Sequence, residues 1–237
     1  MSLDRSWQFV GGLESWPYRT FETLRRRLNR RLVGFLFRQL RCADARSPCR
    51  VLEPGCGTAY ALSLMQQHHD VALAVAADLD ESALREGKKS NPELIAVVAD
   101  LERLPFADNA FRLVYNSSTI EHLETPATAV REMQRVCERQ GRVFVGVPYL
   151  FGPLAFQPVI RGTKLGRWLG PVFTQRSLRA LLSRADLEPE TAVTYVWRFF
   201  IGMTAQKELT KPFWGPAQRN TPGAAESHTV LATGAHA

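Results

Sequence analysis

The chain lacks the features that mark several classes of protein. Its 237 residues include only four cysteines, Cys42, Cys49, Cys56 and Cys137, and no Cys-x-x-Cys pair. The histidines offer no spacing that would complete a zinc site, so we expect no bound metal and free thiols in a reducing compartment. No apolar run reaches the roughly 18 residues that a membrane span requires. The N-terminus also lacks the basic-then-apolar order of a secretory signal, which predicts a cytoplasmic protein.

Charge is unevenly distributed along the chain. The formal net charge is +7, and residues 1–50 hold eleven arginines against four acidic residues, a surplus of seven. Residues 51–237 hold nineteen basic and nineteen acidic residues. An enzyme of nucleic acids would more often carry basic residues around its catalytic domain as well, so we do not expect a nucleic-acid partner. The excess predicts a basic appendage: an N-terminal helical arm or cap over residues 1–47, ahead of one domain over 48–237.

Residues 21–41 read as a basic amphipathic helix. Apolar residues recur every three or four positions from Phe21 to Leu40, and arginines fill the remaining faces. Three interpretations stay open for this helix. It packs on the domain or closes over a ligand, it attaches peripherally to an anionic membrane, or it contacts a nucleic acid or a protein partner. The sequence leaves the oligomeric state undetermined.

From residue 50 onward, strand and helix patterns alternate. Strands are expected at 50–53, 71–78, 93–100, 110–118, 142–148, near 191–200 and at 228–235, and helices at 58–69, 80–90, 125–141 and 173–187. Asp80 is placed to cap the second of these helices, while Thr125 with Pro126 begins the third and Gly141 ends it. Repeated units of this length predict an α/β fold: a doubly wound, Rossmann-like, mostly parallel seven-stranded sheet with helices on both faces.

Polar residues stand where the expected parallel strands end. The first strand ends at Glu53 and the turn Gly55-Cys56-Gly57, and the next ones end at Asp78, Asp100 and Asn116-Ser117. In an open parallel sheet, ligands bind beyond the carboxyl ends of the strands, at the point where the strand order reverses. These residues are therefore the candidate ligand site.

The acids of this edge suit a nucleoside. Asp78 follows Gly55 by 23 residues, close to the spacing of about 20 at which an acid binds ribose hydroxyls in dinucleotide sites. A carboxylate accepts hydrogen bonds from both hydroxyls of a diol. Asp100 is placed to accept from an adenine amine, with the backbone N–H of Leu101 available to the ring.

The glycine turn discriminates among the nucleosides that such a site could hold. A dinucleotide fingerprint requires a third glycine where Tyr60 stands. No Gly-Lys-Ser/Thr run exists for a phosphate-binding loop. No basic residue lies near the turn, and Glu53 would repel a pyrophosphate but attract an ammonium or sulfonium group. A nucleoside with a positive charge indicates S-adenosylmethionine.

Four segments together resemble the class I S-adenosylmethionine-dependent methyltransferases, in the branch whose members mostly act on small molecules such as quinone or lipid precursors. They are "VLEPGCGTA", "VAADLDESAL", "VVADLERLPFADNAFRLVYNSSTIEHL" and "EMQRVCERQGRVFVGVP". The resemblance covers about residues 48–150 strongly and the remainder weakly. It implies S-adenosyl-L-methionine as cofactor and S-adenosyl-L-homocysteine as product. One departure is visible, since Phe111-Arg112 stands where the family commonly has Phe-Asp.

The resemblance also implies roles for individual residues. The turn from Gly55 through Cys56 to Gly57 would face the methionine part of the cofactor, with Glu53 near its amino group. Asp78, followed by Leu79, would bind the ribose, and Asp100 with Leu101 the adenine. Asn116 and Ser117 would supply backbone contacts to the amino acid moiety.

Two residues and one long loop are candidates for the acceptor side. His122 stands just beyond the fourth strand and could remove a proton from a hydroxyl acceptor, or it could simply shape the turn. Tyr149, directly after the fifth strand, could orient an acceptor. Residues 149–173 form a long apolar connection with four glycines, which is typical of a lid or binding loop.

The lid and the aromatic arm together predict a small, hydrophobic acceptor. Methylation of RNA or of a protein is one alternative, which the basic arm allows and the balanced catalytic half disfavours. A catalytically silent binding protein that retains the fold is another. The identity of the acceptor and the atom methylated lie beyond the sequence.

Overall fold

A computed structural model of the chain describes residues 29–38, 49–160, 162–163 and 170–207. Its elements are β1 (Cys49–Pro54), α2 (Tyr60–Gln66), β2 (Val71–Asp78), α3 (Glu81–Ser90), β3 (Ile95–Val98), β4 (Phe111–Ser117), the 3-10 helix η2 (Ile120–His122), α4 (Pro126–Val136), β5 (Cys137–Pro148), α5 (Gln157–Ile160), α7 (Gln175–Ser183), β6 (Leu187–Tyr195) and β7 (Phe200–Lys207). Residues 29–38 form one further helix. Within these ranges, no helix is both long and apolar enough to cross a membrane.

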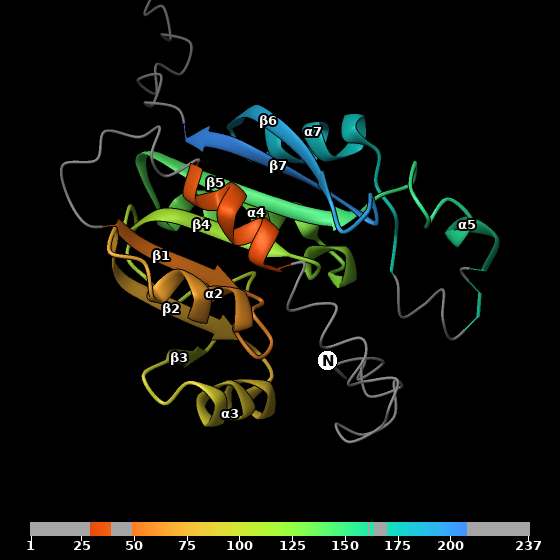
Figure 1. Cartoon of the computed structure of the whole chain (residues 1–237). Helices are drawn as coiled ribbons and strands as arrows, with labels where there is room; N and C mark the ends of the chain where they lie inside the picture. The colour runs from red at the N-terminus through yellow and green to blue at the C-terminus, as the bar shows by residue number, and fades with distance from the viewer. Residues whose placement is uncertain (1–28, 39–48, 161, 164–169, 208–237) are drawn as a thin grey trace, which may run out of the picture.

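The strands form one seven-stranded sheet in the order β3-β2-β1-β4-β5-β7-β6. β3, β2, β1, β4 and β5 are mutually parallel, and β7 runs antiparallel between β5 and β6 (Figure 1). Strand order reverses between β1 and β4, since the chain first proceeds outward to β3 and then returns to the other side of β1. The predicted doubly wound, mostly parallel α/β sheet is confirmed.

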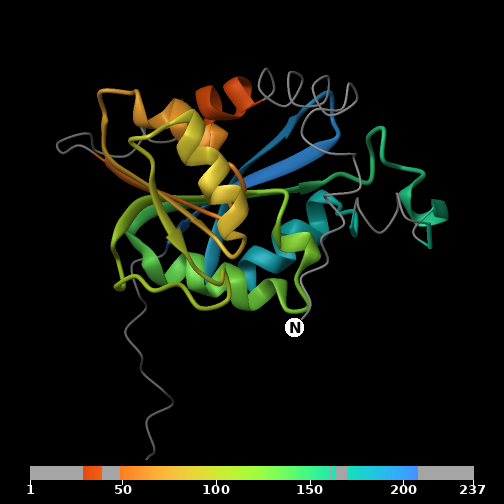
Figure 2. The same cartoon turned by 90° about the horizontal axis from the view of Figure 1, so that it is seen from below.

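Both faces of the sheet are buried under helices. Consecutive residues of a strand point to opposite faces, so Val51 and Phe144 belong to one core while Leu52 and Val145 belong to the other. The first core includes residues of the 29–38 helix and α2, and the second includes residues of α4 and α7. Figure 2 shows these two helical layers above and below the strands.

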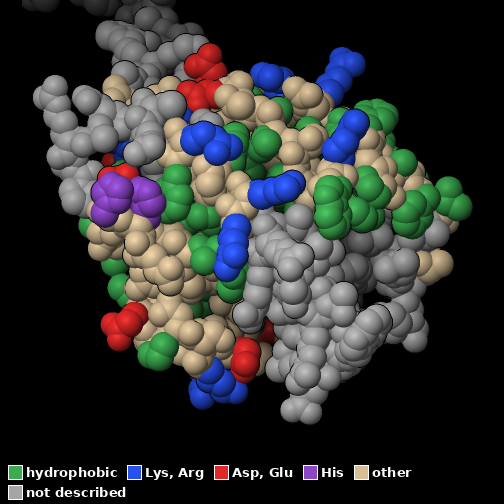
Figure 3. Space-filling model, viewed as in Figure 1, with side chains coloured by type: hydrophobic (Ala, Val, Ile, Leu, Met, Phe, Trp, Pro, Cys, Tyr) green, Lys and Arg blue, Asp and Glu red, His purple; other side chains and the backbone are tan. Residues whose placement is uncertain are grey.

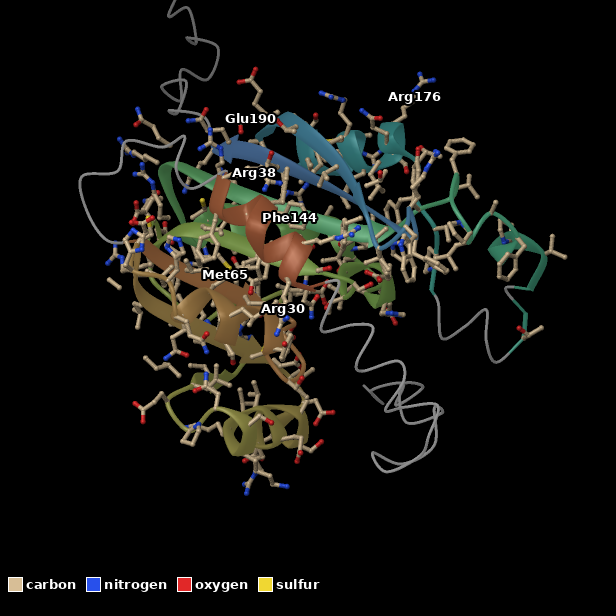
Figure 4. All side chains as sticks on the ribbon, viewed as in Figure 1. Arg30, Arg38, Met65, Phe144, Arg176 and Glu190 are labelled. Atoms are coloured by element: carbon tan, nitrogen blue, oxygen red, sulfur yellow. The ribbon has the colours of Figure 1, made fainter. Side chains whose placement is uncertain are left out.

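The described part of the basic amphipathic helix packs on the domain. Leu32 and Leu36 are 2% and 0% exposed, and the Phe35 ring lies 5.9 Å from that of Phe144 in β5. Arg30 and Arg38 lie on its exposed side (Figure 4). Over residues 29–38, the apolar face is therefore used for packing against the sheet. The rest of the predicted arm, 1–28 and 39–47, lies outside the described residues.

The predicted helix 125–141 is longer than the observed helix α4 by more than one turn. α4 begins with Pro126 at its first turn, as expected, but ends at Val136, and 137–141 already belong to β5. The N–H groups of Asn109 and Ala110 bind the carbonyls of Arg135 and Val136 at 3.0 and 2.8 Å. These tertiary hydrogen bonds satisfy the last carbonyls of α4 and fix its end. The prediction that Gly141 ends the helix was wrong, because the sequence alone does not show these tertiary hydrogen bonds.

Of the two residues expected to cap helices, one does so and the other does not. Asp80 caps α3 as predicted, since its Oδ1 accepts from the N–H groups of Ser82 and Ala83. Thr125 precedes α4 but makes no capping bond, because its hydroxyl donates to Glu102 instead.

The C-terminal strands also differ from the expectation. The segment near 191–200 contains the end of β6, a tight turn and the start of β7, rather than one strand. Val196, Trp197 and Arg198 adopt positive φ angles in this turn, so a non-glycine reversal occurs where the sequence gives no turn signal. The suggested terminal strand 228–235 lies outside the described residues. β7 supplies the seventh strand of the sheet.

Candidate active site

The predicted ligand residues gather at one edge of the sheet. The loops after β1, β2 and β4 leave the carboxyl ends of neighbouring parallel strands, at the place where strand order reverses. This is the position where open α/β sheets bind ligands. The side chains at this edge are described below in the order of the strands that carry them.

The turn after β1 requires both of its glycines. Gly55 and Gly57 have φ angles of +69° and +54°, a region that residues with a Cβ rarely adopt. A Cβ on Gly55 would approach side-chain atoms of Thr119 and Asn116 to 2.7 and 2.8 Å, whereas a Cβ on Gly57 would meet nothing within 4 Å. The backbone at Gly57 is thus open to a ligand. Burial raises the pKa of the intervening Cys56 thiol, which stays protonated.

Asp78 links the end of β2 to this turn. Its Oδ2 accepts from the N–H of Gly57 at 2.6 Å, and its Oδ1 accepts from the N–H of Asp80 at 2.9 Å. The carboxylate therefore holds the open side of the glycine turn in place. The following residue, Leu79, is 44% exposed.

Glu53 is a buried carboxylate that supports the start of α2. It is 7% exposed, and its Oε2 accepts from the N–H of Leu62 at 3.1 Å and from the hydroxyl of Tyr115 at 2.8 Å. The N–H of Leu62 belongs to the first turn of α2, where backbone donors lack intrahelical partners. Burial, followed by the adjacent Glu53 charge, raises the pKa of Tyr115. Sequence reasoning missed this anchoring contact with Tyr115.

Asp100 and Leu101 lie beyond β3 rather than at its last residue. The predicted strand 93–100 is shorter in the structure, because β3 ends at Val98. The N–H of Ala99 donates to the carbonyl of Asp78 at 3.0 Å, so the chain still passes beside the end of β2. Asp100 is exposed and its Oδ1 accepts from the N–H of Glu102, while Leu101 is buried.

Asn116 and Ser117 end β4 with their side chains in different contacts. Asn116 is fully buried and donates from Nδ2 to the carbonyl of Pro54 at 2.7 Å. Its Oδ1 is buried and has no hydrogen-bond partner in the structure as described. Ser117 Oγ lies 2.8 Å from the hydroxyl of Tyr195. A buried acceptor without a donor is costly, so Asn116 Oδ1 points to a ligand that brings an N–H.

The structure adds Glu121, which was not among the predicted site residues. Glu121 is 4% exposed and, among the described residues, its Oε2 has no hydrogen-bond partner. Burial raises the pKa of its carboxyl to about 8. Its Oε1 lies 4.0 Å from Nε2 of His122, whose side chain is 43% exposed. Nothing in the sequence distinguishes this glutamate from a solvent-facing one, since η2 is too short for a periodic pattern.

Tyr195 and Gly170 complete the surroundings of Glu121. Tyr195 extends from β6 with a buried hydroxyl, and its pKa is raised by burial and also by the charge of Glu121. A Cβ on Gly170, whose φ is +66°, would lie 3.2 Å from Cγ of Glu121 and 3.0 Å from Cε1 of His122. The end of the 149–173 loop therefore lies directly on these two residues.

Tyr149 lies at the start of the long loop and is fixed there by its backbone and its ring. Its N–H donates to the carbonyl of Phe199, its backbone pairs with Phe173, and its ring meets that of Phe151 edge-on at 5.8 Å. Tyr149 thus joins the two ends of the long loop to the turn between β6 and β7. Its role towards an acceptor stays a prediction.

The residues of this edge fit S-adenosylmethionine. The orphaned Asn116 Oδ1 offers an acceptor for an ammonium group, and the open backbone at Gly57 leaves room for a ligand against the turn. The fold and the site together are those expected of a nucleoside-binding α/β domain.

Comparison with known proteins supports this class. Residues 52–145 match the family described as a methyltransferase domain. The malonyl-[acyl-carrier protein] O-methyltransferase of Halorhodospira halophila is 36% identical over 109 residues, which is 45% of this chain and 36% of that protein. The demethylmenaquinone methyltransferase of Renibacterium salmoninarum is 29% identical over 145 residues, 61% of this chain and 56% of that protein. The chain thus spans about a third to a half of the length of these relatives.

A solved structure shows the same fold. The geranyl diphosphate C-methyltransferase of Streptomyces coelicolor, in complex with Mg2+, geranyl diphosphate and S-adenosyl-L-homocysteine, superposes with a TM-score of 0.61 at 13% identity. The match covers 84% of this chain and 88% of that one. Residues 52–145 thus resemble the methyltransferase domain of S-adenosylmethionine-dependent methyltransferases, and S-adenosylmethionine is the cofactor that this resemblance supports.

Proposed function

We propose that this protein transfers a methyl group from S-adenosylmethionine to a small, apolar acceptor that binds beside Glu121 and His122. The observation that carries the proposal is the juxtaposition at η2. A buried carboxyl, whose Oε2 has no partner among the described residues, and a half-exposed histidine lie at the same sheet edge as the glycine turn, against Gly170 of the returning loop. An edge that only bound a nucleoside would have no use for this pair.

The residues that would hold the cofactor follow from the geometry. The backbone around Gly57 is open and faces the methionine part, and Asn116 Oδ1 accepts from its ammonium group. Asp78 binds the ribose, while Asp100 and the N–H of Leu101 bind the adenine. Glu53 contributes a buried negative charge beneath the turn, which favours a cationic ligand over a phosphate.

The chain's own groups align the acceptor, handle its proton and exclude water. When bound, S-adenosylmethionine supplies a methyl group on a positively charged sulfur, a group that nucleophiles attack in line. His122 takes the proton of a hydroxyl acceptor. Glu121, neutral at pH 7 because of its raised pKa, donates a hydrogen bond to the acceptor or to His122. Gly170 of the 149–173 loop lies against both residues and helps to keep water from Glu121.

The acceptor class rests on the loop and on the relatives. Tyr149, Leu154 and Phe173 of the 149–173 loop pack inward, and the loop as a whole is apolar. The two relatives act, by their names, on malonyl-[acyl-carrier protein] and demethylmenaquinone. Both observations support a small-molecule acceptor rather than a nucleic acid.

Calorimetry with S-adenosylmethionine tests the cofactor site. Asp78→Asn removes a charge at the carboxyl end of β2, and Asp70→Asn removes one just before its other end and serves as the matched control. We expect Asp78→Asn to weaken binding about tenfold or more, since charged hydrogen bonds contribute the most, and Asp70→Asn to leave it unchanged. Thermal unfolding of both variants separates lost binding from lost folding. Equal affinity in a folded Asp78→Asn variant would refute the ribose assignment.

Incubation of host extracts with the enzyme and isotopically labelled cofactor tests the acceptor. The extract is separated into RNA, protein and small-molecule fractions, and each is examined by mass spectrometry. We expect the label in the small-molecule fraction, in compounds that partition into organic solvent. Label confined to RNA or protein would overturn the acceptor class, and label in no fraction would support a catalytically silent protein.

A further inference from the structure

More than half of the large exposed apolar residues of the described structure lie on two segments that are joined by a hydrogen bond. Seven large hydrophobic residues are exposed among the described residues, and four of them belong to the loop after β5, to α5 and to the turn between β6 and β7, which is hydrogen-bonded to that loop. These four are Phe151, Phe156, Val159 and Trp197, at 61%, 49%, 87% and 62% exposure. We call them the apolar tip. Single exposed apolar residues need no explanation, but a concentrated patch indicates a binding surface.

The apolar tip combines two segments that are distant in sequence. Phe151, Phe156 and Val159 belong to the loop after β5 and to α5, and Trp197 belongs to the turn between β6 and β7. Nη2 of Arg198 donates to the carbonyl of Phe151 at 3.2 Å, which joins the turn to the loop. Figures 1 and 2 both show α5 standing out from the body of the molecule, and Figure 3 shows hydrophobic side chains on that side.

The backbone holds Trp197 outward at a cost. Val196, Trp197 and Arg198 have φ angles of 55°, 49° and 66°. Three consecutive non-glycine residues in this region are strained. The neighbouring contact is also close, since a Cβ on Gly152 would fall 1.8 Å from the carbonyl oxygen of Arg198. Such strain is typical of a functional segment and has no purpose in a turn that only connects two strands.

The stretch of sequence that carries Phe151, Phe156 and Val159 has charges of a single sign. Residues 149–185 contain six basic residues and no Asp or Glu: Arg161, Lys164, Arg167, Arg176, Arg179 and Arg184. The remainder of 51–237 therefore holds thirteen basic against nineteen acidic residues. Arg176 points outward from the start of α7 (Figure 4), and Arg198 of the strained turn is also exposed. The balanced total over the domain conceals this local excess.

We propose that the apolar tip docks on an anionic lipid surface. Aromatic and aliphatic side chains that insert at the headgroup boundary, flanked by basic residues alone, are the combination that such a surface binds. The 29–38 helix offers no comparable surface, because its apolar face is packed in the core. The proposal stands independently of the acceptor, although docking would place the loop where an apolar acceptor dissolves.

Vesicle flotation of the full chain tests the proposal. By design, the vesicles contain either phosphatidylcholine alone or phosphatidylcholine with 30% phosphatidylglycerol. Flotation is measured at low and at high salt. Val159→Glu places a charge at the most exposed residue of the apolar tip, and Val98→Glu, 53% exposed in β3 at the far edge of the sheet, is the matched control. Both sites are exposed, so equal thermal unfolding of the variants confirms that neither change alters the fold.

We expect the wild-type chain to float with the anionic vesicles and to be released by high salt. Val159→Glu should weaken this binding about tenfold or more, the loss that corresponds to removing one inserted valine, while Val98→Glu should leave it unchanged. Absence of binding to anionic vesicles, or equal binding by Val159→Glu, overturns the proposal. A wild-type dimer in solution that Val159→Glu converts to a monomer, without vesicle binding by either, identifies a self-association surface instead.

Discussion

Glu121 provides the sharpest test of the candidate active site, because its burial has a calculable effect on stability. In the folded chain, the pKa of its carboxyl is raised from 4.5 to about 8, chiefly because burial disfavours the charge. In the unfolded chain the same group is in water and ionises near 4.5. Between these two values the unfolded state is charged and the folded state is neutral, so folding must take up a proton.

The sign and size of the effect follow from this difference. Below pH 4.5 the group is neutral in both states and has no effect. As the pH rises from 4.5 to about 8, the unfolded state gains stability relative to the folded one, by about 1.4 kcal/mol for each pH unit. The folded chain therefore loses about 3 kcal/mol at pH 7 and about 5 kcal/mol above pH 8, relative to a chain with a neutral residue at this position.

Urea denaturation of wild type and Glu121→Gln, without cofactor, measures this effect. The difference in unfolding free energy between the two chains cancels the other titrating groups, and it should shift by several kcal/mol in favour of Glu121→Gln between pH 4.5 and pH 8.5. Glu93→Gln, at an exposed position, shows how a change of this kind behaves without burial. A Glu121→Gln difference that stays constant over this pH range would refute the burial of this carboxyl.

Two further predictions concern residues that hold neighbouring strands of the sheet together. A Cβ on Gly146 would fall 2.0 Å from the hydroxyl oxygen of Tyr195, so Gly146→Ala should lower the melting temperature markedly in calorimetry. Adding Tyr195→Phe should restore part of the loss, and no restoration would show that the clash lies elsewhere. Lys207 donates from Nζ to the carbonyl of Cys137 and to Asn109 Oδ1, both at 2.8 Å. Lys207→Met should therefore lower the unfolding free energy, measured by urea denaturation, by about 1–3 kcal/mol. An unchanged free energy would contradict a structural role for these hydrogen bonds.

The apolar periodicity of the sequence and its capping and turn residues were enough to predict the parallel part of the fold. β2 matches its predicted bounds, 71–78, because a continuous apolar run between polar residues is typical of a strand buried on both faces. Asp80 was identifiable as a cap because capping depends on a side chain two or three residues away. The end of α4 was not, because Asn109 and Ala110, far from it in sequence, satisfy its last carbonyls.

The candidate site divides in the same way between local and tertiary information. The glycine turn and Asp78 could be predicted because each stands at the end of a strand, and parallel strands bring their carboxyl ends together. Asp100 was placed at a strand end that lies two residues earlier, at Val98. The burial of Glu121 could not be predicted, since it depends on the packing around η2, which includes Gly170 from a loop nearly fifty residues later.

The antiparallel pair β6 and β7 explains why the acceptor side is the hardest part to predict. Tyr195 of β6 reaches Ser117 of β4 across β5 and β7, and β7 follows a turn of non-glycine residues that carries no sequence signal. The same turn presents Trp197 to solvent and binds the loop that starts at Tyr149. The turn between β6 and β7 thus connects the polar residues of the candidate active site with the apolar tip. A change in the turn should therefore affect both acceptor turnover and lipid binding, whereas Val159→Glu, at the outer end of the loop, should weaken lipid binding first.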